Sequence, residues 1–411
     1  MKKSIITLLW LCTSVSLSSA EIKILPLIDA RVNGGKSVFR GSSDSLKGSC
    51  ELILVPVIKF SERFSLLPQY EVKYFGQKSS TELAGGGRLH PKEQNHLISV
   101  KVINKFDNEL KLKNRAGYKW VYLKETKDES WGDSLFNWDK VFGAIELEKK
   151  FKRHPVIFEG RFEYYQIRYP NYDSLSAKAP DPDWRELSGK KPLDYNANEI
   201  FMKMTCFLNP KVRLGGEYIY THNAYTNQLV VDEKGNAGPK KRRDNINEIK
   251  LSLMYFPEIK TSNRGATSLR TSYTCKITDS NQNHFDTNWN RFANVQRKNF
   301  IHDFFDTTLH KISPQITFKL PQNKDLTLTY EYGYTKYKER LAQNKEGYYK
   351  NERMYSRSQV YDINLLIPLN KGFSIDINGN FKNVDSNMKY ERFYNYDYRC
   401  RNYSIGLLYQ Y

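Results

Sequence analysis

The chain has 411 residues, of which 39% are hydrophobic, 27% charged and 14% aromatic, and its formal net charge is +19. Its mean hydropathy is −0.66, and no run of about 18 apolar residues follows the N-terminal segment, which excludes a transmembrane helix. No CxxC pair occurs, so neither a zinc site nor a dense disulfide framework is expected.

The N-terminal segment has the pattern of an export signal. Lys2 and Lys3 precede an apolar stretch from Ile5 to Leu11, and Ser18-Ser19-Ala20 supplies small residues for cleavage. We therefore predict a signal peptide over 1–20 and a mature chain that begins near Glu21. Export argues against nucleic acid as the partner of the basic chain. Three explanations of its charge stay open: an anion-attracting interior, loops that bind anionic polymers, or a generally basic proteome.

After the signal, extended segments with a period of two follow one another along the whole chain. Such a period gives each strand one apolar and one polar face. We predict sixteen strands, with fourteen as the alternative count, at 22–32, 49–60, 65–75, 96–105, 109–123, 140–151, 155–169, 198–208, 211–222, 246–256, 265–278, 304–320, 325–337, 355–369, 372–382 and 399–411.

The connections between these segments alternate in length. Most links from an even strand to the next odd strand are tight turns, such as Asn209-Pro210 and Asn370-Lys371. Most links from odd to even strands are long: 76–95, 124–139, 170–197, 223–245, 279–303, 338–354 and 383–398. Short turns on one rim and long loops on the other predict an all-β fold, an up-and-down antiparallel transmembrane β-barrel over 21–411.

Alternation also predicts which side chains line the interior. A charge on the lipid face costs about 2–4 kcal/mol at the bilayer midplane, so polar faces should point inward. Strands 4 and 5 then place a basic strip on the pore wall, and strands 6 and 7 place acids of opposing charge beside it. The basic strip is Lys101, Lys105, Lys111, Lys113, Arg115 and Lys119, and the acids are Glu146, Glu148, Glu159 and Glu163.

Two interpretations of these charges stay open. The strip could favour anionic or zwitterionic solutes, because charged rings set ion preference in pores. Alternatively, the acids and bases could neutralise one another as a solvated network. The run Lys240-Lys241-Arg242-Arg243 falls in the predicted loop 223–245. If the run has a function, contact with lipopolysaccharide phosphates is the one we expect; the default interpretation is a solvated run of charges.

The cysteines are read from the same alternation. Cys206 and Cys275 fall on apolar faces as small hydrophobic residues. Cys50 and Cys400 lie on strands that flank the first strand, which leaves a disulfide between them open.

Catalysis is not expected. No HExxH or GxSxG motif occurs, and His310 and Ser313 lie three apart on one strand and therefore on opposite faces. We predict no cofactor and no metal.

The last strand completes the pattern and carries a resemblance. Its apolar positions are every second residue to the end of the chain: Tyr403, Ile405, Leu407, Tyr409 and Tyr411. This ending resembles the closing strand of bacterial outer-membrane β-barrels of porin type, whose terminal aromatic residue is read during membrane insertion.

The resemblance implies a place in the outer membrane of a Gram-negative-type bacterium, and lipid, lipopolysaccharide and the barrel-assembly machinery as partners. It leaves association as a homotrimer open. The expected function is passive diffusion of small hydrophilic solutes, with an inclination towards anions. The alternative is a non-conducting surface or adhesion barrel that acts through its long basic loops. A secreted soluble β-protein is the third candidate.

Overall fold

The computed structural model describes residues 22–39, 45–81, 88–106, 109–151, 154–173, 190–257, 268–285, 300–370, 372–390 and 396–411. The predicted signal peptide at 1–20, the start of the mature chain at Glu21 and the centre of the loop 170–197 lie outside these residues. In the described part, no helix is long and apolar enough to cross a membrane.

Sixteen long strands form the wall of the molecule. They are β2 (Ile28–Phe39), β3 (Ser45–Leu54), β5 (Phe64–Gln77), β8 (Lys92–Phe106), β9 (Leu110–Lys124), β10 (Trp138–Phe151), β11 (Val156–Arg168), β12 (Tyr195–Asn209), β13 (Val212–Val231), β14 (Ala237–Tyr255), β15 (Ser268–Ser280), β18 (Thr307–Leu320), β19 (Lys324–Gln343), β20 (Tyr349–Pro368), β21 (Phe373–Ser386) and β22 (Tyr398–Gln410).

Short strands lie at the edge of this wall or in its loops. β1 (Lys23–Leu25) pairs with β4 (Val57–Lys59), and two small hairpins, β6 (Ser80–Thr81) with β7 (Arg88–Leu89) and β16 (His284–Phe285) with β17 (Phe300–Ile301), lie in the loops. A 3₁₀ turn, η4 (Pro321–Asn323), joins β18 to β19.

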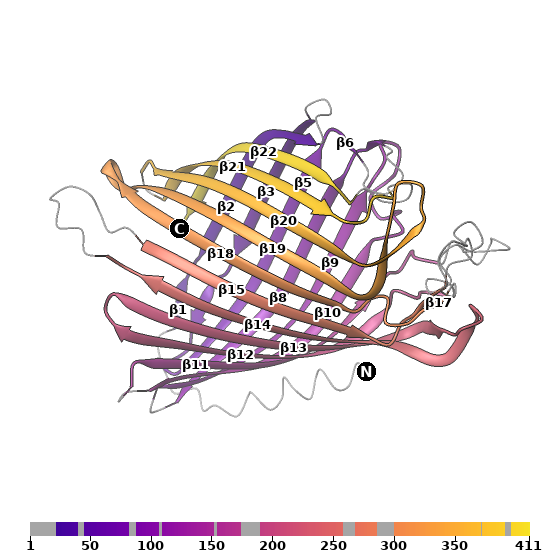
Figure 1. Cartoon of the computed structure of the whole chain (residues 1–411). Helices are drawn as coiled ribbons and strands as arrows, with labels where there is room; N and C mark the ends of the chain where they lie inside the picture. Colours follow the sequence, from indigo (N-terminus) through magenta and orange to yellow (C-terminus); the bar gives the residue numbers. More distant parts are fainter. Residues whose placement is uncertain are drawn as a thin grey trace.

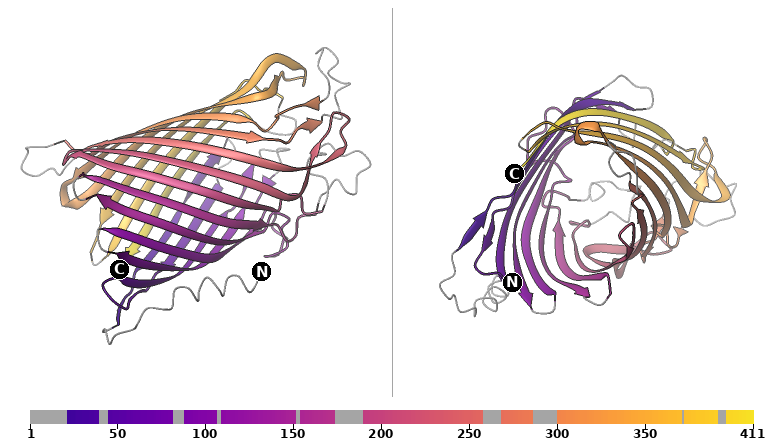
Figure 2. Two further views of the ribbon diagram at one scale, coloured as in Figure 1. Left: turned by 90° about the horizontal axis from the view of Figure 1, so that it is seen from below. Right: turned by 90° about the vertical axis from the view of Figure 1, so that its left-hand side faces the viewer.

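The wall closes on itself. Each long strand pairs antiparallel with its neighbours in the chain, and the last strand, β22, pairs with the first, β2, from Asp29↔Gln410 to Phe39↔Cys400. Viewed along its axis, the strands surround a common centre (Figure 2). The predicted count of sixteen is confirmed, and so is the up-and-down antiparallel barrel.

Glycines at the closing seam let the first and last strands come together. A Cβ built on Gly35 would fall on the carbonyl oxygen of Tyr403, and one built on Gly406 would fall on the Asn33 side chain and 2.8 Å from the Val32 carbonyl oxygen. Backbone atoms cannot yield to a side chain as a flexible chain end can. The seam therefore requires glycine at both positions.

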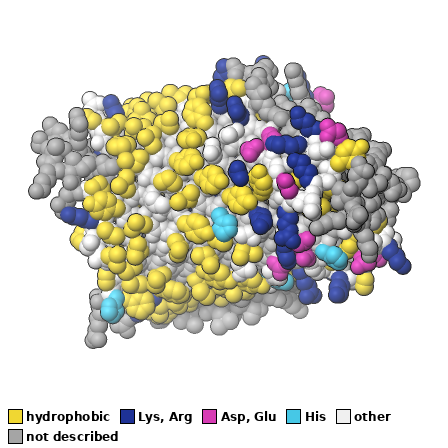
Figure 3. Space-filling model, viewed as in Figure 1, with side chains coloured by type: hydrophobic (Ala, Val, Ile, Leu, Met, Phe, Trp, Pro, Cys, Tyr) yellow, Lys and Arg dark blue, Asp and Glu magenta, His cyan; other side chains and the backbone are white. Residues whose placement is uncertain are grey.

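The outer face of the barrel is apolar because alternate side chains of each strand point away from the centre. Ile405 on β22 is 58% exposed, and Ile363 on β20 is 45% exposed. Large exposed hydrophobic residues of this kind recur on nearly every strand and form a broad apolar band on the outside (Figure 3). A band of exposed apolar side chains is stable against lipid hydrocarbon and unstable against water.

The two rims differ as the chain pattern predicts. The tight links after β8, β10, β12, β18 and β20 lie on one rim, near the C-terminus, and the longer links that carry β6 and β17 lie on the other (Figure 1). We call these the turn rim and the loop rim. In outer-membrane barrels, the short turns face the periplasm and the long loops face outward.

Several strands run further than the sequence predicts. The expected loops 223–245 and 338–354 are mostly strand, because β13 and β14 continue to Val231 and from Ala237, and β19 and β20 continue to Gln343 and from Tyr349. These ends pair by backbone hydrogen bonds across register shifts, which need no apolar alternation. The first strand also differs from the predicted 22–32: the chain breaks around Pro26, and β2 begins at Ile28.

Beyond the wall, the strand extensions share a small packed core at the loop rim. Its apolar side chains are almost inaccessible to solvent, and they are Val231, Phe304, Leu341, Ala342, Met354 and Met388. Buried polar groups there are hydrogen-bonded: Ser280 Oγ donates to Asp244 Oδ1 at 2.6 Å, and Gln282 Nε2 donates to the Leu229 carbonyl at 2.9 Å. The loop rim is therefore a folded lobe and not only a set of loops.

The four cysteines of the described chain are free thiols. Cys206 and Cys275 share the outward face with Met204 and Tyr273, as predicted. The disulfide between Cys50 and Cys400 that the sequence leaves open is not formed in this structure. Cys50 lies opposite Val32 and is exposed on the outside, whereas Cys400 lies opposite Phe39, seven positions further along β2 and on the inward face.

Candidate functional site: the charged inner wall

The inner wall of β8 to β11 follows from the same alternation. Tyr118 on β9 and Ile145 on β10 are exposed on the outside, so the odd positions of β9 and the even positions of β10 point inward. The register places Lys113 directly opposite Glu146 and Lys111 opposite Glu148. The structure thus brings the predicted basic strip and two of the predicted acids onto one continuous surface.

Three lysines of the strip are held by two glutamates. Lys113 Nζ contacts Glu146 and lies 2.9 Å from Glu148 Oε2. Lys111 Nζ donates to Glu148 Oε1 at 2.8 Å, and Lys101 Nζ lies 3.7 Å from Glu146 Oε2. Each lysine therefore has a carboxylate of β10 within ion-pair distance, and the three lysines share the two glutamates. We call Lys101, Lys111, Lys113, Glu146 and Glu148 the lysine–glutamate cluster.

The other cations of the strip have no carboxylate within ion-pair distance in the described chain. The Arg115 guanidinium lies 5.1 Å from the centre of the Phe142 ring, and Lys119 Nζ lies 5.0 Å from the centre of the Trp138 ring. Lys105, at the turn rim, is exposed and lies opposite Lys111. Arg115 and Lys119 are stabilised by aromatic faces and have no direct ion pair in the described chain.

The charge network continues onto β11 and β12. Lys140 Nζ donates to Glu163 Oε1 at 2.6 Å, and Arg161 donates to Glu199 Oε1 at 2.6 Å while its Nε lies 3.9 Å from Glu163. Each basic residue here contacts an acid on the next strand. Such an arrangement lets each charge find a partner on the next strand.

The predicted acids lie beside the basic strip, on the next two strands. Glu146 and Glu148 lie on β10, beside the strip, and Glu159 and Glu163 lie on β11, one strand further. Glu159 is 3.9 Å from Lys203 on β12. The charges form adjacent ion pairs along one part of the wall, where the predicted basic strip and the predicted acids lie on neighbouring strands.

An aromatic row accompanies these charges, and the sequence interpretation missed it. Tyr165, Tyr195 and Tyr225 point inward from β11, β12 and β13, with ring centres 6.4 Å and 5.3 Å apart. Lys140 Nζ lies 3.8 Å from the centre of the Tyr165 ring, and Arg242 lies 4.6 Å from that of Tyr225. The face assignment of these strands would have identified the row, because each tyrosine occupies an inward position.

Arg242 also decides the role of the basic run at 240–243. Its guanidinium donates to Asp244 at 2.9 Å through two nitrogens, and its side chain is only 14% exposed. The run lies on β14 and not in a loop, so its members point alternately inward and outward. Arg242 is an inward residue with a partner of its own.

The wall of β20 and β21 has a different character. Asn364 donates to Asp376, and Asn378 and Asn380 both donate to Asp362, at 3.2 and 3.1 Å. These side chains are amides and acids, with no basic partner among those hydrogen bonds. This part of the inner surface is therefore also polar, but its hydrogen bonds join amides to acids, in contrast to the ion pairs of β8 to β12.

The closing strand places the predicted insertion signal on the outside. Tyr403, Ile405 and Leu407 are 43%, 58% and 46% exposed on the lipid face, and the Tyr409 ring packs 4.7 Å from that of Phe373. Tyr411 exchanges two backbone hydrogen bonds with Ile28. Recognition of this strand by the insertion machinery stays a prediction.

In the described residues, no group of three or more His, Cys, Asp or Glu is arranged to hold a metal ion. What the structure does show is a closed barrel with a polar inner wall, an apolar outer band, short turns on one rim and a folded lobe on the other. Its architecture is that of an outer-membrane β-barrel.

No protein-family model and no curated protein sequence matches the chain. Solved structures similar to it in fold are outer-membrane proteins. OccD3 of Pseudomonas aeruginosa has a TM-score of 0.47 at 9% identity, over 94% of this chain and 91% of that one. OccAB4 of Acinetobacter baumannii has 0.46 at 12%, over 97% and 100%, and OmpT of Vibrio cholerae has 0.46 at 10%, over 97% and 100%. At these identities, the likeness extends to the overall fold and not to individual residues.

Proposed function

We propose that the protein is a water-filled outer-membrane channel for passive diffusion of small hydrophilic solutes. The observation that carries this proposal is the inner wall, where ionised side chains run from β8 to β12 and further polar side chains cover β20 and β21. Partly exposed ion pairs of this kind need water beside them, because desolvation of both partners is costly. A sixteen-stranded barrel also encloses more space than its side chains can fill.

The inclination towards anions rests on two residues. The lysine–glutamate cluster supplies three positive and two negative charges that are paired, whereas Arg115 and Lys119 face the interior over aromatic rings without a carboxylate partner. A unit charge about 4 Å from a passing ion changes its energy by about 1 kcal/mol in water. That amounts to about fivefold in local anion concentration.

Conductance in planar bilayers tests both statements. The purified barrel should conduct, and its reversal potential in a salt gradient should indicate a preference for anions. Replacing both Arg115 and Lys119 by Gln should shift that preference towards cations. The matched control replaces Lys113 and Glu146 together by Gln, which leaves the net charge unchanged and should leave the reversal potential unchanged.

A barrel that does not conduct would overturn the channel. Conduction without any shift in the Arg115/Lys119 variant would leave the channel but remove the role of these two residues. The second candidate, a non-conducting surface barrel, is favoured by the packed lobe at the loop rim, whose buried Val231, Leu341 and Met354 fix a defined outer surface. Absence of conductance together with binding of whole cells to surface-immobilised barrel would support it.

A further inference from the structure

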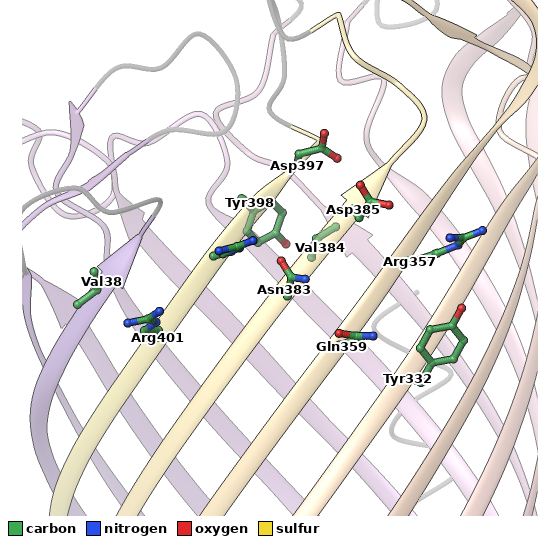
Figure 4. A pocket seen from close by; sticks show the side chains of 11 residues that line it. Val38, Tyr332, Arg357, Gln359, Asn383, Val384, Asp385, Asp397, Tyr398 and Arg401 are labelled. Atoms are coloured by element: carbon green, nitrogen blue, oxygen red, sulfur yellow. The ribbon is translucent and has the colours of Figure 1, made fainter.

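The outer wall carries a cavity that the channel does not use. It has a volume of about 810 Å³ and lies on β20, β21 and β22 towards the loop rim (Figure 4). Its polar lining consists of Arg357, Gln359, Asn383, Arg399 and Arg401, together with Asp385 and Asp397. Arg399 and Arg401 have the same parity as the exposed residues Tyr403 and Ile405, so they point outward. The cavity is therefore on the lipid-facing side.

The strand register brings its polar groups together. Arg399 lies directly opposite Asn383, which in turn lies opposite Gln359, and Arg357 is one inter-strand pair further towards the loop rim. Neighbouring strands are about 4.8 Å apart. Three guanidinium groups from two strands, Arg357, Arg399 and Arg401, thus share one small area, which we call the arginine patch.

The acids beside the arginine patch are already engaged. Lys389, in the loop between β21 and β22, lies 3.6 Å from Asp385 Oδ1 and donates a hydrogen bond to Asp397. Arg399 and Arg401 have no ion pair in the described chain, and Arg357 lies 4.8 Å from the centre of the Tyr355 ring. Asp385 lies directly opposite Arg357, but the three arginines and Lys389 outnumber the two aspartates, so the patch carries a net positive charge.

Its position relative to the membrane is given by the side chains around it. Tyr330 and Tyr361, with ring centres 5.0 Å apart, lie in the same register row as Phe381 and Arg401, and aliphatic residues such as Ile363 and Ile377 follow towards the middle of the barrel. Aromatic girdles mark the edges of the hydrocarbon layer. On the outer surface, Lys and Arg lie beside the apolar band, on its loop-rim side (Figure 3). The arginine patch is thus at the level of the outer-leaflet headgroups.

We propose that the arginine patch binds the phosphorylated headgroup of an outer-leaflet glycolipid, lipopolysaccharide. Guanidinium groups bind phosphate oxygens through paired N–H donors, and the Gln359 and Asn383 amides add neutral donors beside them. The acyl chains of the lipid lie against the aromatic and aliphatic rows below. A second copy of the barrel is a poorer occupant, because a two-fold symmetric contact would bring two arginine patches of like charge together.

Native mass spectrometry of the detergent-solubilised barrel tests this proposal, with bis-phosphorylated lipid A as the probe. The wild-type barrel should bind lipid A and should bind its dephosphorylated form at least tenfold more weakly. Each Arg→Gln substitution in the patch should weaken binding by about fivefold, as expected for one cation near an anionic lipid surface. The triple variant of Arg357, Arg399 and Arg401 should lose binding at the concentrations used.

The control variant is Arg353→Gln. Arg353 is also exposed on β20 but is paired with Glu339 at 2.8 Å, so its loss should change lipid A binding by less than about twofold. Heat-modifiable migration on a gel shows that each variant is a folded barrel. Inorganic phosphate at millimolar concentration should not displace the lipid.

Four outcomes would overturn the proposal. They are equal binding of phosphorylated and dephosphorylated lipid A, equal losses in the control and the patch variants, displacement by inorganic phosphate alone, and an oligomer of wild-type barrels that the triple variant disperses without any change in lipid binding. The last would assign the patch to a second copy. None of these outcomes bears on conductance, so the channel and the lipid site stand or fall separately.

Discussion

Two groups of basic residues, one on each face of the barrel wall, differ in their partners. On the inner face, Lys111 and Lys113 each lie within 3 Å of a glutamate on the next strand. On the outer face, Arg399 and Arg401 have no ion pair in the described chain, and the nearby Asp385 and Asp397 are bound by Lys389. Net charge is therefore a poor guide to what either face binds, because the neighbours of each cation decide how much of its charge is available.

The difference has a physical origin. Side chains on the inner wall lie in a curved, crowded surface where cross-strand neighbours of opposite sign stabilise one another. Side chains on the outer wall at the headgroup level meet phosphates, so a cation there does not need a protein partner. Substitutions that remove acidic partners on the inner wall, or free acidic partners on the outer wall, test this contrast directly.

The largest effect is expected from making the inner wall resemble the outer one. Replacing both Glu146 and Glu148 by Gln leaves Lys101, Lys111 and Lys113 without their carboxylates. Two fewer negative charges beside the water-filled space should raise the preference for anions by about tenfold at low salt. Reversal potentials in a salt gradient measure it, and an unchanged value would show that ions do not pass near the cluster.

The converse change makes the outer wall resemble the inner one. Lys389→Gln releases Asp385 and Asp397, which can then neutralise the arginine patch, so lipid A binding should fall by about fivefold. Arg353→Gln again serves as the control. Undiminished lipid A binding in Lys389→Gln would mean that the two aspartates do not govern the patch.

The charge on Lys389 should persist at alkaline pH. Burial lowers its pKa, but the hydrogen bond to Asp397 and the charges of Asp397 and Asp385 outweigh that effect, and the pKa is raised above the ordinary lysine value of about 10.4. A raised lysine pKa keeps the ion pair intact below that value and loses it only as the pH rises through the higher one. Lipid A binding should therefore vary by less than about twofold between pH 7 and pH 9, when measured by native mass spectrometry.

The smallest effect is expected where a complete pair is removed. Replacing both Lys111 and Glu148 by Gln keeps the net charge of the inner wall. The ion preference should stay within about 1.5-fold of that of the wild type, because the net charge beside the water-filled space is the same. The barrel should stay folded, because a partly exposed pair contributes only about 0–1 kcal/mol to stability. A large shift in reversal potential would show that the pair orients its neighbours and does not merely neutralise charge.

The strand count and the face assignments could be predicted from the sequence, because lipid imposes a strict period of two on every crossing. Glu146 and Lys113 were placed on the inner wall by that rule alone. Their direct pairing depends on the register between strands, and no pattern within a single strand specifies that register. The sequence therefore predicts an acidic strip beside the basic one but does not specify which lysine contacts which glutamate.

The arginine patch was missed for a related reason. Polar side chains were expected to point inward throughout, which holds only where hydrocarbon covers the outside. From the aromatic row of Tyr330 and Tyr361 towards the loop rim the penalty disappears, and outward charge is tolerated. The sequence shows that Arg401 and Tyr403 lie on the same face of their strand. It does not show where along that strand the hydrocarbon layer ends, so it does not predict that an outward arginine is tolerated there.

The seam between β2 and β22 has a consequence for biosynthesis. Gly35 and Gly406 allow the two outermost segments of the polypeptide to join, so the cylinder is completed only when its final strand has been made. A chain that lacked β22 would keep two open edges of unpaired N–H and C=O groups, which readily join other chains or aggregate. The barrel can therefore close only after β22 has been synthesised, and a chain without this strand cannot form a closed barrel.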